Sequence, residues 1–285
     1  MLSKLFVIIQ HILPQHLLSR WVGCIAESRL GLVKNALIKL FIKAYNVDMT
    51  EAIHRDPSLY GSFNEFFARE LIPGARPLCS ATAAIAAPAD GAISQVGEIE
   101  SGFIIQAKGR EFDVTTLMGG DDYLSDPFRG GKFMTIYLAP KDYHRVHMPC
   151  DGQLQTMIHV PGQLFSVNDA TTQQVANLFA RNERVVSIFD TDAGPMAVVM
   201  VGAMVVASIE TTWAGIITPP RRQVRTTHYP DTREVKLSKG SQLGSFRLGS
   251  TVIVLFGPDM VDWEANLATG ANIKMGSQIG AFSNG

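Results

Sequence analysis

The sequence predicts an α+β protein, with amphipathic helices at the N-terminus followed by a mostly antiparallel β-domain of sandwich or barrel-like type. Apolar residues between Gly31 and Tyr45 recur at helical spacing. From Ala87 onward, short β-rich runs alternate with Gly, Pro, Asp and Asn, which is typical of antiparallel strands joined by turns. With 285 residues, 46% of them hydrophobic, the chain is long enough to bury a large core.

The first helices are predicted over residues 2–12, 15–27 and 31–45, with Pro14 opening the second. Lys34, Lys39 and Lys43 are expected to lie away from the centre of the apolar stripe on the third helix. Up to Val47 the chain has six basic residues and one acidic residue. This pattern is typical of helices that lie among the head groups of an anionic membrane. Helices that pack on their own domain would give the same apolar periodicity, and that alternative stays open.

Three other features limit the cellular setting and the partners. The chain has no apolar run of the roughly 20 residues needed to span a bilayer, and no small-residue cleavage site closes its apolar start. The net charge of −1 gives no reason to expect nucleic acid as a partner. Three cysteines at unpatterned spacing are interpreted as free thiols in a reducing compartment.

A further helix is predicted over Ser62–Leu71, with Ser62 as its N-cap and Glu65 three residues later. Pro73, Gly74 and Pro77 then break the pattern, so a helical membrane-associating region over residues 1–75 and a catalytic domain over 76–285 are expected. Strands are predicted at Phe103–Gln106, Phe133–Leu138, Val185–Phe189, Ala197–Ile209, Val235–Leu237 and Thr251–Phe256. Short helices are predicted at Val114–Met118 and Ala170–Phe179.

Three groups of residues could support nucleophilic chemistry. The pair Gly249-Ser250 stands at the mouth of an apolar strand, in FRLGSTVIVLF, although four other Gly-Ser pairs occur in the chain. A serine nucleophile needs a base and an orienting group. His144 and His147 in YHRVHMP and Asp90 in PADG are the candidates. Each could equally be a turn or structural residue, and because no third ligand accompanies the two histidines, no metal site is predicted.

Longer blocks around these residues resemble bacterial phosphatidylserine decarboxylases. The blocks are PADG at Pro88–Gly91, YHRVHMP at Tyr143–Pro149, GQLFSVN at Gly162–Asn168, LFARNERV at Leu178–Val185, SIETTWAGIITPP at Ser208–Pro220, LGST at Leu248–Thr251, and the opening ILPQHLLSR and KAYNVDM. The resemblance covers essentially the whole chain.

The resemblance implies a proenzyme, or zymogen, that cleaves itself between Gly249 and Ser250. His147 would be the general base on Ser250, and Asp90 would orient the imidazole. Cleavage would give a β chain of residues 1–249 and an α chain of residues 250–285, held together as a heterodimer. Ser250 would become a covalent pyruvoyl group, the cofactor of the mature enzyme.

The implied reaction is a lyase reaction of phospholipid biosynthesis. The amine of phosphatidylserine would form a Schiff base with the pyruvoyl ketone and lose CO2, giving phosphatidylethanolamine. His144 is the expected acid, Ser166 a candidate for holding the head group, and Leu164 and Phe165 candidates for bordering the acyl entrance. The expected location is the cytoplasmic face of the cell membrane, with the protein bound peripherally to an anionic surface; whether a higher homo-oligomer forms is left open.

Two alternatives make a different prediction. A conventional serine hydrolase using Asp90, His147 and Ser250 on an external substrate would keep an intact chain. A non-enzymatic membrane-associated β-domain would also keep one chain, and its histidines would be structural.

Overall fold

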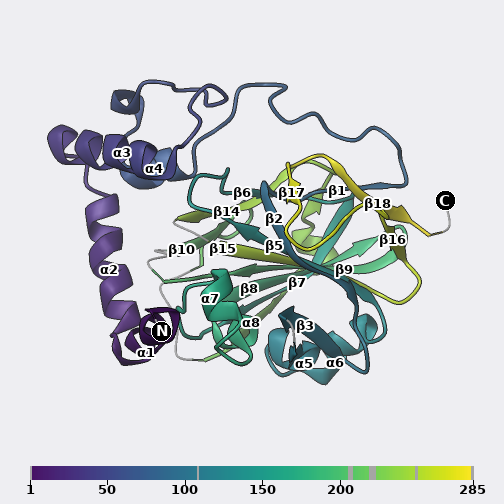
Figure 1. The fold of residues 1–285 in the computed structure, drawn as a ribbon. Helices are drawn as coiled ribbons and strands as arrows, with labels where there is room; N and C mark the ends of the chain where they lie inside the picture. The colour runs from purple at the N-terminus through teal and green to yellow at the C-terminus, as the bar shows by residue number, and fades with distance from the viewer. Residues whose placement is uncertain (1, 108, 205–207, 218–222, 248–249, 284–285) are drawn as a thin grey trace.

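The computed structural model describes residues 2–107, 109–204, 208–217, 223–247 and 250–283 (Figure 1). The described α-helices are α1 Leu2–Ile12, α2 Gln15–Ala26, α3 Gly31–Tyr45, α4 Phe63–Phe67, α5 Val114–Leu117, α6 Asp122–Ser125, α7 Asp169–Thr172 and α8 Leu178–Arg181. The described strands are β1 Ala84–Ala86, β2 Gly91–Glu98, β3 Phe103–Ala107, β4 Arg110–Asp113, β5 Lys132–Leu138, β6 Arg145–His147, β7 Gly152–Val160, β8 Arg184–Thr191, β9 Gly194–Val201, β10 Ser208–Thr211, β11 Gly215–Ile216, β12 Arg225–His228, β13 Lys236–Leu237, β14 Gln242–Arg247, β15 Ser250–Phe256, β16 Val261–Trp263, β17 Asn272–Ile273 and β18 Gln278–Phe282.

The predicted α+β class is confirmed. The largest sheet has the strand order β12-β7-β8-β9-β15-β5-β2-β17, with β13 also paired to β7. Its neighbouring strands run antiparallel. Two smaller sheets, β11-β10-β14-β6 and β1-β18-β16, lie with it in a sandwich, and the described strands close no barrel.

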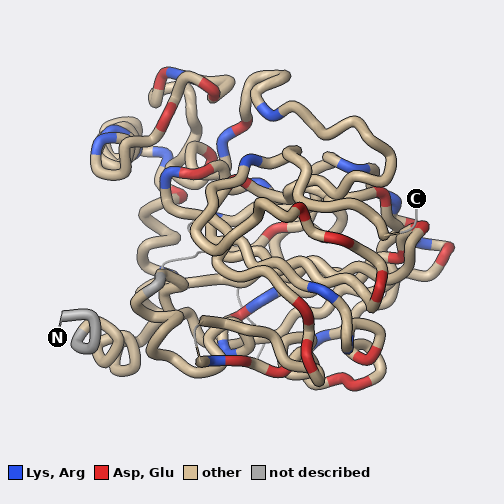
Figure 2. The backbone as a smooth tube through the Cα atoms, turned by 45° about the vertical axis from the view of Figure 1, so that its right-hand side comes forward, with Lys and Arg blue, Asp and Glu red and all other residues tan. Residues whose placement is uncertain are grey.

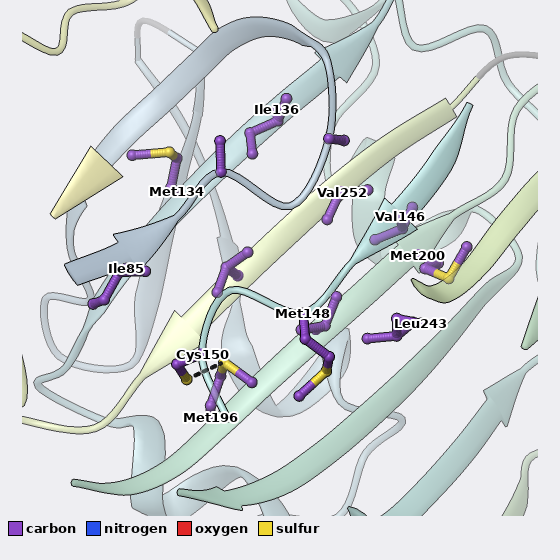
Figure 3. Close-up of a cluster of buried hydrophobic side chains, with 14 of the residues drawn as sticks. Ile85, Met134, Ile136, Val146, Met148, Cys150, Met196, Met200, Leu243 and Val252 are labelled. Atoms are coloured by element: carbon purple, nitrogen blue, oxygen red, sulfur yellow. Dashed lines mark hydrogen bonds between the residues drawn. The ribbon is translucent and has the colours of Figure 1, made fainter. Parts of the chain in front are cut away.

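The central sheet is buried on both faces because its inner strands are apolar at successive positions. On β15, Val252, Val254 and Phe256 face the two small sheets, whereas Ile253 and Leu255 face the opposite side. Figure 3 shows the first of these cores, where Met134, Met148 and Met200 fill the space between the sheets. The second core is covered by the β3–β4 hairpin and by α5 and α8. Alternation of side chains along a strand explains both assignments.

The N-terminal region has a small core of its own. Ile38 of α3 is buried with Tyr60 and the phenylalanines of α4. Ser62 caps α4 by accepting a hydrogen bond from the Glu65 backbone N–H at 3.2 Å, as predicted. The helix ends at Phe67 rather than Leu71, because the chain then leaves the helix to bond residues 51–53, with the Ile53 N–H donating to the Glu70 carbonyl at 3.0 Å.

Three other predictions were wrong in detail. The single strand Ala197–Ile209 is two strands, β9 and β10, which belong to different sheets. The helix Ala170–Phe179 is divided into α7 and α8, with Asn177 in the left-handed region at φ 55° between them. Lys34 points inward, where its ammonium group donates to the carbonyls of Ser58, at 2.9 Å, and Tyr60.

The first helices leave apolar side chains on the surface. Ile12 is 78% exposed, Trp21 65% and Leu32 91%. Figure 2 shows that α1 and α2 contain few charged residues. None of the helices within the described ranges is long and apolar enough to cross a bilayer.

Candidate active site

The antiparallel register of the central sheet brings the start of β15 beside the ends of β5 and β9 and near the start of β2, whereas His147 lies on β6 of the β11-β10-β14-β6 sheet. Ser250 at the start of β15 pairs with Leu138 at the end of β5, and Thr251 pairs with Val201 at the end of β9. β2 lies beyond β5 and begins one residue after Asp90. Since adjacent strands are about 4.8 Å apart, the turns after β5 and before β2 lie beside the start of β15.

His147 lies at the end of β6, with both ring nitrogens engaged. Nδ1 is 2.9 Å from the Gly240 carbonyl, and Nε2 is 3.0 Å from the Tyr143 hydroxyl. A carbonyl oxygen can only accept, so Nδ1 carries the proton and Nε2 accepts from Tyr143. Burial, opposed by the bond to Gly240, lowers the pKa of His147, so its neutral form with a lone pair on Nε2 is favoured. This tautomer is the one that a general base on a serine requires.

Asp90 is held by a cation rather than by His147. Arg76 Nε donates to Asp90 Oδ1 at 2.8 Å, Arg76 Nη2 donates to Oδ2, and the Met275 backbone N–H donates to Oδ1 at 2.9 Å. Arg76 also donates to Glu51 at 2.7 Å. Burial alone would lower the pKa of Arg76, but the bonds to Asp90 and Glu51 outweigh it and the pKa is raised. Among the described residues, Asp90 and His147 share no hydrogen bond, so the influence of Asp90 on the imidazole is through space.

His144 is fully buried beside α4. Its Nδ1 donates to the Asp142 carbonyl at 2.8 Å, and its ring lies 4.0 Å from the Phe67 ring, centroid to centroid. Nε2 is buried and has no hydrogen-bond partner within the described part of the chain. Burial is the main cause that lowers the pKa of His144, to about 3. The side chain is therefore a neutral imidazole with an unused acceptor nitrogen.

The Gly162–Asn168 turn follows β7, which lies three strands from β15 in the sheet order. Leu164 and Phe165 are buried, and Ser166 is half-buried. Leu164 lies over Gly202, just beyond the end of β9, where a Cβ built on that glycine would be 3.6 Å from Leu164 Cδ2. The turn thus reaches back toward β9, the strand beside β15.

The predicted cleavage bond lies at the limit of what is described. Gly249 and the side chain of Ser250 lie outside the described residues; the backbone of Ser250 is described as the first residue of β15. Two observations fit a prosthetic group made from Ser250. The Nε2 atom of His144 is buried without a partner among the described residues. An apolar strand bonded on both sides would hold a new chain end in place.

Comparison with known proteins decides the family. A family model described as phosphatidylserine decarboxylase matches residues 63–281, and a second, described as PSD, matches residues 5–46. The chain belongs to the phosphatidylserine decarboxylase family. It is 56% identical over 283 residues to a phosphatidylserine decarboxylase proenzyme of Pseudomonas putida, with 99% of each chain covered. Proteins of the same name from Ectopseudomonas mendocina, at 56% identity over 282 residues, and Pseudomonas fluorescens, at 55% over 282, are similar over 98% of this chain and 99% and 98% of their own lengths.

These matches confirm the predicted family and the predicted class of enzyme. Sequence reasoning missed three contributors to the site: Tyr143, Arg76 and the Gly240 carbonyl. Tyr143 belongs to the motif that contains both histidines, so its position was a usable signal. Arg76 stands between Gly74 and Pro77, which indicated only a break in secondary structure.

Proposed function

We propose that this protein cleaves itself between Gly249 and Ser250 and then decarboxylates phosphatidylserine to phosphatidylethanolamine at a membrane surface. The observation that carries the proposal is the neutral His147, which has its proton on Nδ1 and Nε2 as an acceptor. Family membership and the proenzyme names of the relatives support it.

In the cleavage step, the Tyr143 hydroxyl releases Nε2 of His147, and the Ser250 Oγ bonds to the Gly249 carbonyl carbon while its proton passes to that nitrogen. Breaking the Gly249–Ser250 C–N bond, with His147 returning the proton to nitrogen, leaves an ester. Loss of the Cα proton of residue 250 expels the Gly249 carboxylate and forms dehydroalanine. Tautomerisation and attack of water release ammonia and leave the pyruvoyl group. Asp90, with Arg76 holding its carboxylate, stabilises the imidazolium that forms on His147.

When formed, the pyruvoyl group supplies a ketone that reacts with the substrate amine and accepts the electrons released as CO2 leaves. The remaining work belongs to side chains. His144, through Nε2, is the proposed acid that delivers a proton to the carbon that has lost CO2. Burial favours its neutral form, so the imidazole is protonated only when the negative charge of the bound substrate offsets that burial.

Ser166 is proposed to bind the head group, and Leu164 and Phe165 to border the acyl chains. Ser166 Oγ has no hydrogen bond to any described residue, so it is available to a ligand, although turn serines often bond their own backbone. The exposed apolar residues on α1 and α2 support peripheral binding of the protein to the cell membrane. The three cysteines are free, which fits the proposed cytoplasmic face.

Intact-mass measurement of the purified full-length protein tests the proposal. We expect two fragments, the smaller starting at residue 250 with a pyruvoyl end. Ser250→Ala and His147→Ala are expected to remain whole, while the matched control Ser277→Ala, at another Gly-Ser pair, is cleaved as wild type. A single unmodified chain in active material would support the hydrolase alternative and end this proposal.

A further inference from the structure

The helices α1 and α2 hold the Gly162–Asn168 turn through polar side chains. Gln10 Oε1 accepts a hydrogen bond from the Ser166 N–H at 2.8 Å, and Gln15 Oε1 accepts one from the Leu164 N–H at 2.7 Å. His16 Nε2 lies 2.9 Å from the Gly162 carbonyl. Gln10 and Gln15 are buried, with 1% and 8% of their surfaces exposed, and together they form a glutamine latch on the turn.

Each glutamine of the latch also makes a hydrogen bond through its side-chain nitrogen. Gln10 Nε2 donates to Thr171 Oγ1 at 3.2 Å, and Gln15 Nε2 donates to the Gln10 carbonyl at 2.8 Å. The His11 ring meets the Phe165 ring edge-on, with centroids 4.8 Å apart. Buried amides with both the oxygen and the nitrogen bonded fix one geometry, since any other arrangement leaves an unpaired group.

A third amide holds the same turn from the β-domain. Asn182 Oδ1 accepts from the Phe165 N–H at 3.0 Å, and its Nδ2 donates to the carbonyls of Phe165, at 2.8 Å, and Gly202, at 2.9 Å. Three successive backbone N–H groups, those of residues 164, 165 and 166, are therefore each bound by a side-chain amide. Two of the three amides come from the N-terminal helices.

The helices use their polar face for this contact and leave their apolar face outward. Buried residues of α2 are Gln15, Ser19, Gly23 and Ala26. The outward residues of α1 and α2 are Phe6, Ile8, Ile9, Ile12, Leu17, Trp21 and Ile25, each at least 40% exposed. An amphipathic helix that served only to pack on its domain would bury the opposite face. The same two helices thus present one face to the Gly162–Asn168 turn, called the substrate turn because of the proposed role of Ser166, and the other face to the proposed lipid surface.

We propose that Gln10 and Gln15 are positioning residues that hold the substrate turn in order, so that docking of the helices supports decarboxylation directly as well as by anchoring. The inference rests on the proposed role of Ser166 in binding the head group. The hydrogen bond from its backbone N–H to Gln10 fixes the position of the Ser166 backbone, and its hydroxyl has no partner among the described residues. We expect the glutamine latch to have no part in self-cleavage, because its hydrogen bonds within the described residues go to the turn, to Thr171 and to α1 rather than to Asp90, Tyr143 or His147.

The test compares Gln10→Leu and Gln15→Leu with Gln10→Glu and Gln15→Glu in the full-length protein. Glutamate keeps the accepting oxygen for the turn N–H, and at these buried positions its neutral carboxyl can donate in place of Nε2, whereas leucine removes both groups. We expect the leucine variants to be cleaved and to bind anionic vesicles within about twofold of wild type. Their KM for phosphatidylserine should rise about tenfold, in line with the loss of a partner for a buried N–H. The glutamate variants should recover most of this loss.

Two further readouts separate positioning from anchoring. Amide hydrogen exchange in the 162–168 peptide should accelerate in the leucine variants and stay slow in the glutamate variants. The loss should also appear with a monomeric short-chain phosphatidylserine, which needs no membrane. Unchanged KM and exchange in a Gln10→Leu/Gln15→Leu protein, or a loss confined to vesicle substrate with weaker vesicle binding, would overturn the proposal. Failure of the wild type to cleave would instead refute the proposed function, and intact mass reveals that separately.

Discussion

The cleavage edge, the group formed by Asp90, Tyr143 and His147, and the substrate turn, Gly162–Asn168, are supported by different parts of the molecule. The cleavage edge, formed by Asp90, Tyr143 and His147, is held mainly by the β-domain and its linker through Arg76, Met275 and Gly240. The substrate turn, Gly162–Asn168, takes two of its three backbone anchors from the N-terminal helices. We therefore expect the proposed self-cleavage to depend on the β-domain, and the proposed lipid turnover to depend on both regions. The two reactions should therefore be separable by mutation.

The largest separation is expected at His144. His144→Asn keeps a donor for the Asp142 carbonyl but has no basic nitrogen, so decarboxylation should fall by about 10²- to 10⁴-fold. Cleavage should proceed normally, because His147 supplies that base. Intact mass and CO2 release measured on the same preparation check both expectations. Full turnover by this variant would remove His144 from its proposed role, and loss of cleavage would show that the two reactions share it.

Replacement of Arg76 should slow cleavage, the reaction that His144→Asn is expected to spare. Its side chain is 6% exposed, and removing one partner of a buried ion pair typically costs about 3–5 kcal/mol. In Arg76→Met, the Asp90 carboxylate loses its fixed position, and we expect cleavage to slow by about 10- to 100-fold, which corresponds to about 1.4–2.7 kcal/mol in the barrier. Cleavage of the full-length precursor made by cell-free synthesis gives the rate.

Arg129→Met is the matched control for Arg76, since Arg129 pairs with Asp122 and Asp126 on a half-exposed surface. Arg76→Lys keeps the charge and should restore part of the rate without the two-pronged contact. Wild-type cleavage in Arg76→Met would show that Asp90 needs no support from this guanidinium.

Most of the helices and strands could be predicted, because the spacing of apolar residues along the sequence indicates which side chains are buried. The Gly31–Tyr45 helix was predicted with its observed bounds, and the strand at Thr251–Phe256 differs by one residue. Lys34 was misplaced because sequence periodicity cannot show that the carbonyls of Ser58 and Tyr60 would pair with its ammonium group inside the fold. The break at Asn177 likewise depends on tertiary contacts: Leu178 is held by Gln106, some seventy positions earlier in the chain.

The candidate site was predictable in its motifs but not in its pairings. Asp90 and the two histidines were chosen because they stand in turns next to strands. The register of β2, β5 and β15 explains why the turn before β2 and the turn after β5 lie side by side. That Asp90 bonds Arg76, while His147 bonds Gly240 and Tyr143, depends on side-chain directions across two sheets. Spacing along the chain contains no information about such contacts.

The smallest expected effect concerns the outward face of the helices. Deleting residues 1–47 would remove Ile38 and Val47 from the small N-terminal core, so a loss of binding would have two explanations. Trp21→Ser avoids this, because Trp21 is 65% exposed on α2. Partial burial of an aromatic ring in lipid contributes about 1 kcal/mol, and we expect vesicle affinity to fall by about three- to tenfold.

The matched control for Trp21 is Tyr123→Ser on α6, a ring that is 85% exposed but belongs to the lobe beside the β3–β4 hairpin. Sedimentation with anionic vesicles measures the binding of each variant. Because the glutamine latch lies on the other face of α1 and α2, Trp21→Ser should leave both cleavage and the KM for monomeric short-chain substrate unchanged. Equal loss of vesicle binding in both variants would mean that the helices are not the membrane-facing surface. A raised KM for monomeric substrate in Trp21→Ser would mean that the two faces do not act separately.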